Sequence, residues 1–244
     1  MAEEQTLLRN SIKKFILKID LLPLNNLKHL EIVDKLAPFF TRVESRNVSN
    51  FAINLTTTNT EIKENKVVDF VLVNTEYNYT VTISEPQNSI YFETSNYTNS
   101  NTYRNFIEIL NEVLTLIEKP IQSKRIGLRY VNEFNCESPR QIASIFSTRL
   151  SKIIKIMLTA DGLSRIIGLE EYNSTMIKSR LQYGIPNKHY PAPILKLDFL
   201  LDIDCYIDST EAHETWPEAI KNINHSAYEH FINSINPQFI EKLK

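Results

Sequence analysis

Apolar and polar residues alternate along much of the chain, most regularly in residues 195–208. Every odd position there is apolar, from Leu195 to Ile207, whereas the even positions other than Leu200 are polar or charged. A period of two residues places successive side chains on opposite faces of a β-strand. The pattern predicts a strand over 194–207, and across 195–208 one face is apolar while the other carries four carboxylates.

Similar patterns divide the rest of the chain into strands and helices. Alternating or β-branched apolar runs predict further strands at 11–21, 51–57, 67–73, 77–84, 89–95, 124–134, 164–171 and 175–185. Apolar residues at helical spacing predict helices at 26–40, 102–118, 139–158 and 215–234. Ser138, followed by Pro139 and Gln141, is typical of a helix N-terminus.

The order of these elements repeats once along the chain. A strand, a helix, several strands and a second helix occur twice, and the two occurrences meet near residues 120–123. We therefore predict an α+β fold with a duplicated strand-helix-strands-helix unit, forming two mainly antiparallel sheets covered by helices. The halves span 1–122 and 123–244. Because no low-complexity linker separates them, we expect them to pack closely as one unit.

Glycine is scarce, which argues against several enzyme classes. The 244-residue chain contains 4 glycines, where an average chain of this length holds about 17. Phosphate-binding loops need clustered glycines, because the backbone must approach the anion closely. The stretch Gly162–Ile166 also departs from the GxSxG motif, since Ile166 stands in place of the second glycine. Nucleotide hydrolases, simple dinucleotide oxidoreductases and α/β-hydrolases are therefore disfavoured.

Charge and cysteine content indicate which partners and which cellular compartment the protein has. Lys and Arg total 27 and Asp and Glu total 29, giving a net charge of −2, which is not typical of a dedicated nucleic-acid binder. Cys136 and Cys205 form no CxxC motif and indicate reduced thiols. The N-terminus lacks a basic and apolar leader, and no apolar run reaches the roughly 20 residues of a membrane helix. We expect a cytoplasmic protein without a membrane segment.

Three segments carry a family resemblance. Lys124–Asn132 reads KRIGLRYVN, Leu197–Tyr206 reads LDFLLDIDCY, and Ile223–Phe231 reads INHSAYEHF. Together they resemble a sporadically distributed prokaryotic family of uncharacterised proteins of similar length, with an R-x-GLRY-x-N segment, an LDID-like strand and a closing helix that contains histidine. The resemblance implies a bacterial or archaeal origin and the patchy inheritance of mobile defence or toxin–antitoxin genes. It implies no active site.

Arg125 and Arg129 share one face of the predicted strand 124–134, and Asn132 lies on the other. Two arginines on one face could hold a carboxylate or phosphate of a ligand. They could equally form ion pairs with Asp202 or Asp204 on a neighbouring strand. We favour the internal ion pair, because the two segments with the clearest family resemblance are these two strands.

The carboxylates of 194–207 allow two interpretations. Asp198, Asp202 and Asp204 share a face, and the last two lie close enough to hold a divalent cation. The favoured interpretation is structural or partner-facing. His225 and His230 are five positions apart, which does not fit the HExxH metal motif. We expect no catalytic residues, metal or cofactor. The candidate binding residues are Arg125, Arg129, Asn132, Asp198, Asp202 and Asp204.

These features favour a non-enzymatic interaction or regulatory protein. An antitoxin, an inhibitor or an accessory subunit of a bacterial defence or mobile-element system fits best, with a protein partner encoded nearby. Two alternatives remain open. One is an RNA-binding or RNA-processing protein with paired ferredoxin-like units. The other is a metal-dependent hydrolase that uses Asp198, Asp202 and Asp204.

Overall fold

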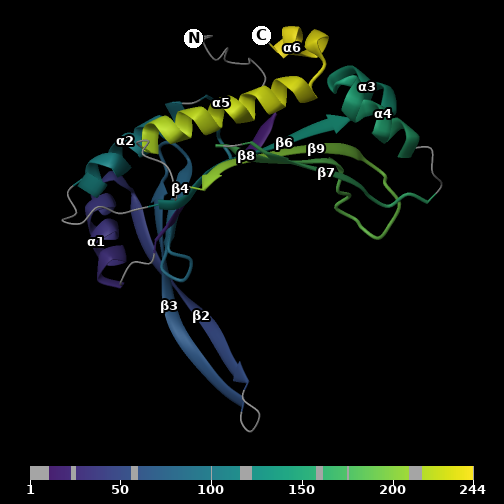
Figure 1. Cartoon of the computed structure of the whole chain (residues 1–244). Coiled ribbons are helices and arrows are strands. Elements are labelled where there is room, and N and C mark those ends of the chain that lie inside the picture. Colours follow the sequence, from purple (N-terminus) through teal and green to yellow (C-terminus); the bar gives the residue numbers. More distant parts are fainter. Residues whose placement is uncertain are drawn as a thin grey trace.

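The strands of the chain form one continuous antiparallel sheet (Figure 1). The computed structural model describes residues 11–22, 26–55, 60–99, 101–115, 123–157, 162–174, 176–208 and 216–243. Within these residues nine strands lie in the order β2-β3-β4-β5-β1-β6-β9-β8-β7. The strands are β1 (Ile12–Leu21), β2 (Arg42–Leu55), β3 (Thr60–Asn74), β4 (Tyr79–Ser84), β5 (Ser89–Thr94), β6 (Ser123–Cys136), β7 (Ile166–Asn173), β8 (Lys178–Ile185) and β9 (Leu197–Asp208).

Each of the four predicted helical ranges contains helix, whereas the helix at 237–243 was not predicted. They are α1 (Asn26–Leu36) with the short 3-10 helix η1 (Ala37–Phe39), α2 (Asn101–Thr115), α3 (Pro139–Ile145), α4 (Thr148–Met157), α5 (Trp216–Ser234) and α6 (Pro237–Leu243). The side chain of Ser138 accepts a hydrogen bond from the Gln141 amide, which confirms the predicted cap of α3. The predicted helix 215–234 is described from Trp216 onward, because residue 215 lies outside the described residues. No helix in the described ranges is long and apolar enough to cross a membrane.

The prediction of two sheets is wrong, because β1 and β6 pair with each other. Their antiparallel register joins Phe15 to Tyr130, Leu17 to Leu128 and Ile19 to Ile126. Alternation shows which face of a strand is buried, but it does not show which strand lies beside it. Pairing of β1 with β6 satisfies backbone groups that two separate sheets would leave at exposed edges. The strands of both halves therefore belong to a single sheet.

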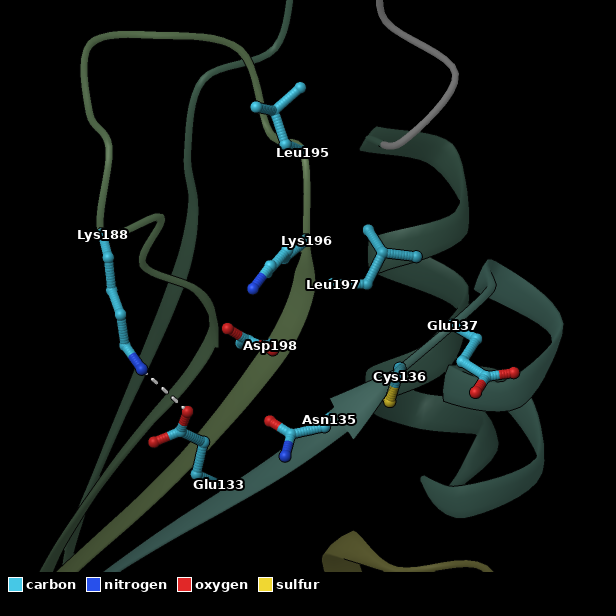
Figure 2. Close-up of a pocket in the computed structure, with 9 residues that line it drawn as sticks. All are labelled: Glu133, Asn135, Cys136, Glu137, Lys188, Leu195, Lys196, Leu197 and Asp198. Atoms are coloured by element: carbon cyan, nitrogen blue, oxygen red, sulfur yellow. Dashed lines mark hydrogen bonds and ion pairs between the residues drawn. The ribbon is translucent and has the colours of Figure 1, made fainter.

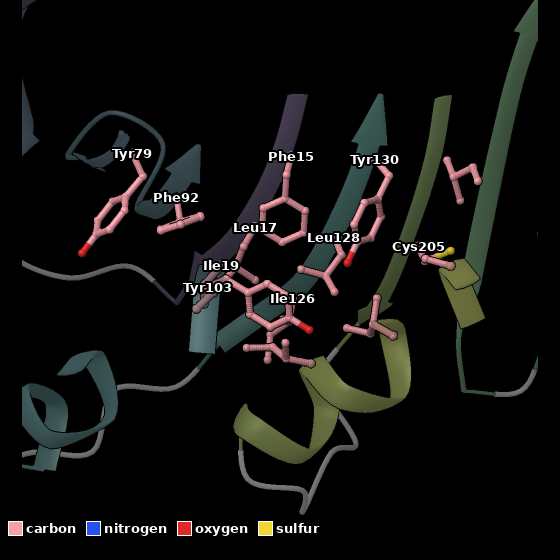
Figure 3. Close-up of a cluster of buried hydrophobic side chains, with 14 of the residues drawn as sticks. Phe15, Leu17, Ile19, Tyr79, Phe92, Tyr103, Ile126, Leu128, Tyr130 and Cys205 are labelled. Atoms are coloured by element: carbon pink, nitrogen blue, oxygen red, sulfur yellow. The ribbon is translucent and has the colours of Figure 1, made fainter. Parts of the chain in front are cut away.

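The described helices cover only one face of this sheet, so the predicted covering is also only partly correct. Figure 3 shows side chains of β1 and β6 on the covered face, where the ring centroids of Phe15 and Tyr130 lie 4.9 Å apart. Helix α5 lies across β6 and β9 on this face (Figure 1). The core residues alternate with residues that are half-buried or exposed, apart from the buried Gly127 and Asp202 on the opposite face. We call the opposite, uncovered face the open face.

The predicted helix 139–158 is broken at Phe146. Residue Phe146 is extended rather than helical (φ −98°, ψ 151°) and forms an isolated β-bridge with Ile235. Its ring lies 5.0 Å from that of Phe134 and 4.0 Å from that of Phe199. A straight helix would not place the ring between these two strands, so tertiary packing overrides the helical pattern here.

The β2–β3 hairpin extends beyond the rest of the sheet. Its two strands pair from Arg42–Val73 to Leu55–Thr60, whereas β3 pairs with β4 only over Asp69–Asn74. In Figure 1 the hairpin projects away from the body on the side opposite α5. The sequence predicts only the shorter strands 51–57 and 67–73 here, because residues 42–50 and 60–66 are mostly polar.

Candidate functional site

The centre of the open face is covered with ion pairs between neighbouring strands. Every second residue of four neighbouring strands points to this face. The series starts at Lys14 on β1, at Arg125 on β6, at Asp198 on β9 and at Lys178 on β8. Opposite charges meet on these strands and on β5. The pairs at 2.6 to 2.8 Å are Lys14–Glu93, Arg129–Asp202 and Lys178–Asp208 between strands, and Lys18–Asp20 within β1. The positive charges of this face are thus largely neutralised by the protein itself.

Arg129 and Asp202 form the predicted internal ion pair. The Arg129 Nε donates to Oδ1 of Asp202 at 2.9 Å, and Nη2 donates to Oδ2 at 2.6 Å. The Asp202 side chain is 7% exposed and that of Arg129 is 48% exposed. These hydrogen bonds raise the pKa of the Arg129 guanidinium above its ordinary value. Two parallel bonds to one carboxylate are the strongest geometry that arginine offers.

Arg125 takes part in a second cluster, with Gly127, Asp204 and Tyr206. Its guanidinium lies 3.7 Å from the centroid of the Tyr206 ring, and its Nη2 lies 3.5 Å from Oδ2 of Asp204. Gly127 is opposite Tyr206 in the register, and a Cβ on Gly127 would lie 3.3 Å from the Tyr206 Cβ. The missing side chain leaves room for the tyrosine. Burial raises the pKa of Asp204, although the nearby Arg125, Arg129 and Arg180 lower it.

Asn132 lies on the covered face, away from the two arginines. Its amide nitrogen donates to the Leu201 carbonyl of β9 at 3.1 Å, and its amide oxygen accepts from the Ser11 hydroxyl at 3.0 Å. Tyr130 on the same face donates its hydroxyl hydrogen to the side-chain oxygen of Asn224 on α5. The R-x-GLRY-x-N segment therefore connects β6 to β9, to the start of β1 and to α5. Sequence reasoning missed this structural role.

Asp198 is separated from Asp202 and Asp204. It lies opposite Asn135 near the end of β6, where both line a pocket of about 600 Å³ (Figure 2). Lys188 in this pocket forms an ion pair with Glu133 at 3.0 Å. The other lining residues are Cys136, Glu137, Leu195, Lys196 and Leu197. The three aspartates of the hydrolase hypothesis thus do not form one cluster.

Both cysteines are held in unreactive settings, and two of the described histidines lie beside other side chains. Burial raises the pKa of the Cys136 and Cys205 thiols to about 11, and a protonated thiol is a poor nucleophile. His225 lies 4.0 Å from Glu229, whereas the ring of His230 lies 4.9 Å from that of Tyr172. Among the residues that the structure describes, no three His, Cys, Asp or Glu side chains are grouped so as to hold a metal ion.

Three apolar residues on the open face were missed by sequence reasoning. Ile16, Val131 and Leu200 are half-buried and occupy diagonal positions on β1, β6 and β9. We call them the apolar stripe. The only sequence signal is that each interrupts the polar side of its strand, as Leu200 does among the even positions of 195–208. The Arg129–Asp202 ion pair borders the stripe.

The chain matches no protein-family model and no curated protein. Its resemblance to the prokaryotic family with the R-x-GLRY-x-N segment therefore stays a prediction. Any functional interpretation depends on the geometry of the sheet and its open face. Two features of that face bear on function: the apolar stripe and the ion pairs around it.

Proposed function

We propose that the protein is a non-enzymatic interaction protein that binds a protein partner through the open face of its sheet. The observation that carries this proposal is the apolar stripe of Ile16, Val131 and Leu200, bordered by ion pairs. Protein interfaces typically combine an apolar centre with a polar rim. A sheet face without a helical layer offers such a surface without rearrangement of the fold.

The charge pattern favours a protein partner over RNA. Binding to a nucleic-acid backbone depends on cations that can contact phosphates. Arg129 is already held by Asp202, and Arg125 is stacked on Tyr206 beside Asp204. A phosphate would have to displace these carboxylates. A protein surface with its own mixture of charges and apolar groups fits the open face without that cost.

The hydrolase alternative receives less support from the aspartates. A cation bound by Asp202 and Asp204 would compete with the guanidinium groups of Arg129 and Arg125. Asp198 lies in the pocket at the end of β6 and β9 and does not join them. These contacts favour a structural and partner-facing role for the acidic face.

The biological role in this proposal follows from the family resemblance. The protein acts in the bacterial or archaeal cytoplasm as an antitoxin, an inhibitor or an accessory subunit of a defence or mobile-element system. Its partner is encoded nearby, because such systems keep interacting proteins in one operon. The open face supplies the contact surface for that partner.

Coexpression with the flanking genes tests the proposal. The tagged chain should copurify with one flanking gene product in a fixed ratio, and Val131→Lys should abolish copurification while the melting temperature stays near that of the wild type. Lys152→Glu on the exposed surface of α4 is the control and should retain the partner. A partner that binds Val131→Lys as well as the wild type would refute binding at the stripe. Copurified RNA whose retention falls with salt would instead favour the RNA-binding alternative.

A further inference from the structure

Strand β7 is an edge of the sheet with few of the usual protections against pairing. It lies at the end of the strand order and pairs with β8 without a register shift from Ile166–Ile185 to Asn173–Lys178. Its sequence, IIGLEEYN, contains no proline, lysine or arginine, and its charged residues are the adjacent Glu170 and Glu171. Natural sheets protect their edges with bulges, prolines or charged side chains, because an open edge can pair with another strand.

The opposite edge of the sheet shows such protection. Arg42 on β2 pairs with Glu44 at 2.9 Å, and Arg46 lies 3.7 Å from the same carboxylate. These charged side chains follow one face of the edge strand. On β7, by contrast, the open-face positions Ile167 and Leu169 are apolar, and Glu171 is the acidic side chain that follows them.

Apolar side chains are exposed along β7. Ile167 is 43% exposed and Leu169 is 51% exposed, and both lie on the open face of the sheet. Exposed apolar side chains at alternate positions, on a strand whose outer backbone groups face no neighbouring strand, are typical of a sheet edge to which another strand is added. The occupant must therefore be a strand with apolar residues at alternate positions.

We propose that β7 pairs antiparallel with β7 of a second copy of this chain, with Gly168 at the centre of the pairing. This register places Ile167 opposite Leu169 of the other copy. It also places Arg165 opposite Glu171, and two-fold symmetry produces each of these pairs twice. A register centred on Leu169 would set Ile167 against Glu171, and one centred on Ile167 would set Arg165 against Leu169. For the side chains on the open face, only the register centred on Gly168 matches both charge and hydrophobicity.

Arg165 and Glu171 are available for such pairs. The exposed Arg165 guanidinium lies 4.7 Å from the centroid of the Tyr190 ring, and no carboxylate partner of it is found in the described part of the chain. Glu171 lies 3.9 Å from Arg180, and both side chains are more than half exposed. Such a contact is weak, so Glu171 is free to pair with Arg165 of the second copy.

The dimer is distinct from the proposed function, since it uses the edge of the sheet and not the apolar stripe. Pairing about Gly168 would continue the sheet across the two-fold axis. The helices of both copies would then cover the same face, and the two open faces would join on the other side. Val131→Lys, which tests the proposed function, should leave dimerisation unchanged.

Sedimentation equilibrium of the purified full chain and its variants tests the dimer. We expect a dimer for the wild type, and a dissociation constant raised roughly tenfold or more by Arg165→Glu or by Glu171→Arg, because each replaces two attractive pairs with two repulsive ones. The double variant Arg165→Glu/Glu171→Arg should restore the wild-type constant. Leu169→Lys should abolish the dimer, whereas Leu195→Lys, at a residue 80% exposed outside β7, should not.

Three results would overturn the proposal. They are a monomeric wild type at the highest soluble concentration, a dimer that Leu169→Lys leaves intact, and a double charge swap that fails to restore the dimer. Melting temperatures near the wild type must accompany each variant, so that loss of pairing is not loss of folding. If Leu169→Lys misfolds, Leu169→Thr replaces it in the sedimentation experiment, because threonine is well suited to strands.

Discussion

The guanidinium of Arg129 binds the carboxylate of Asp202 diagonally across β6 and β9, and not the directly opposite Asp204. Within this ion pair, Asp202 is more buried than Arg129. A buried carboxylate without its cation is costly, because its lost hydration is no longer compensated. The pair therefore links β6 and β9 at the centre of the sheet.

Loss of the arginine should expose this cost. We expect Arg129→Ala to lower the free energy of unfolding by about 2 kcal/mol, less than a fully buried pair would because the arginine is half exposed. Asp202→Ala should cost less, since the arginine left behind can be hydrated. The double variant should be clearly less destabilised than the sum of both. Urea unfolding of the four proteins measures these differences.

Arg180→Ala is the matched control for this cycle. Its contact with Glu171 is long and exposed, so we expect a loss below about 0.5 kcal/mol. Equal losses for Arg129→Ala and Arg180→Ala, or additive effects in the cycle, would contradict a stabilising role of the Arg129–Asp202 pair.

Gly184 should tolerate no side chain. Its φ is +135°, and a Cβ there would lie 2.2 Å from the Ile166 carbonyl oxygen. We expect Gly184→Ala to destabilise the protein by about 3 kcal/mol, through backbone strain and the displacement of β7. Gly162→Ala is the control, because Gly162 has φ +70° with nothing within 4 Å, and strain alone costs about 1 kcal/mol. Thermal unfolding of both variants should show this difference, and similar losses would count against the clash.

The raised pKa of Asp204 predicts a pH-dependent contribution to stability. Burial favours its protonated form in the folded state, so this group stabilises the fold at acidic pH, and the stabilisation is lost as the pH rises through the raised pKa. Asp204→Asn is uncharged at every pH. We therefore compare the melting temperature of Asp204→Asn with that of the wild type at each pH. The difference, variant minus wild type, should increase as the pH rises from below the ordinary aspartate pKa of about 4 to neutral pH. A difference that is constant or falls with pH would be inconsistent with burial as the dominant cause.

Both thiols should resist alkylation in the native protein. Cys136 and Cys205 are buried, and the pKa of each thiol is raised to about 11 by that burial. At neutral pH the reactive thiolate is scarce. Mass spectrometry after iodoacetamide treatment should show slow labelling of the native chain and rapid labelling in denaturant. Rapid native labelling of either cysteine would mean that it is exposed.

Local structure was readable from the sequence where one face of an element is apolar. In β9 the odd positions do lie on the covered face and the aspartates on the open face, whereas Leu195 precedes the strand and is 80% exposed. Ser138 caps its helix as predicted. Both results depend only on neighbours within a few residues. The break at Phe146 depends on Phe199 and Ile235 instead, which no local pattern reveals.

The arrangement of the strands was less predictable. The pairing of β1 with β6 joins distant parts of the chain, and the alternation in each strand is compatible with one sheet or two. For the site, the charges of Arg129 and Asp202 suggested their contact, because complementary residues are visible in the sequence. The apolar stripe of Ile16, Val131 and Leu200 was not visible, since it exists only when three strands take this register.

The pairing of β1 with β6 also sets an order of events during synthesis. The β2–β3 and β4–β5 hairpins close short loops, whereas Phe15 must wait for Tyr130 to leave the ribosome. Until then the nascent chain carries β1 with one edge unsatisfied, which is a template for mispairing. The central strands of the finished sheet are thus joined late in folding, and delayed translation beyond α2 would prolong the period in which the chain is prone to aggregate.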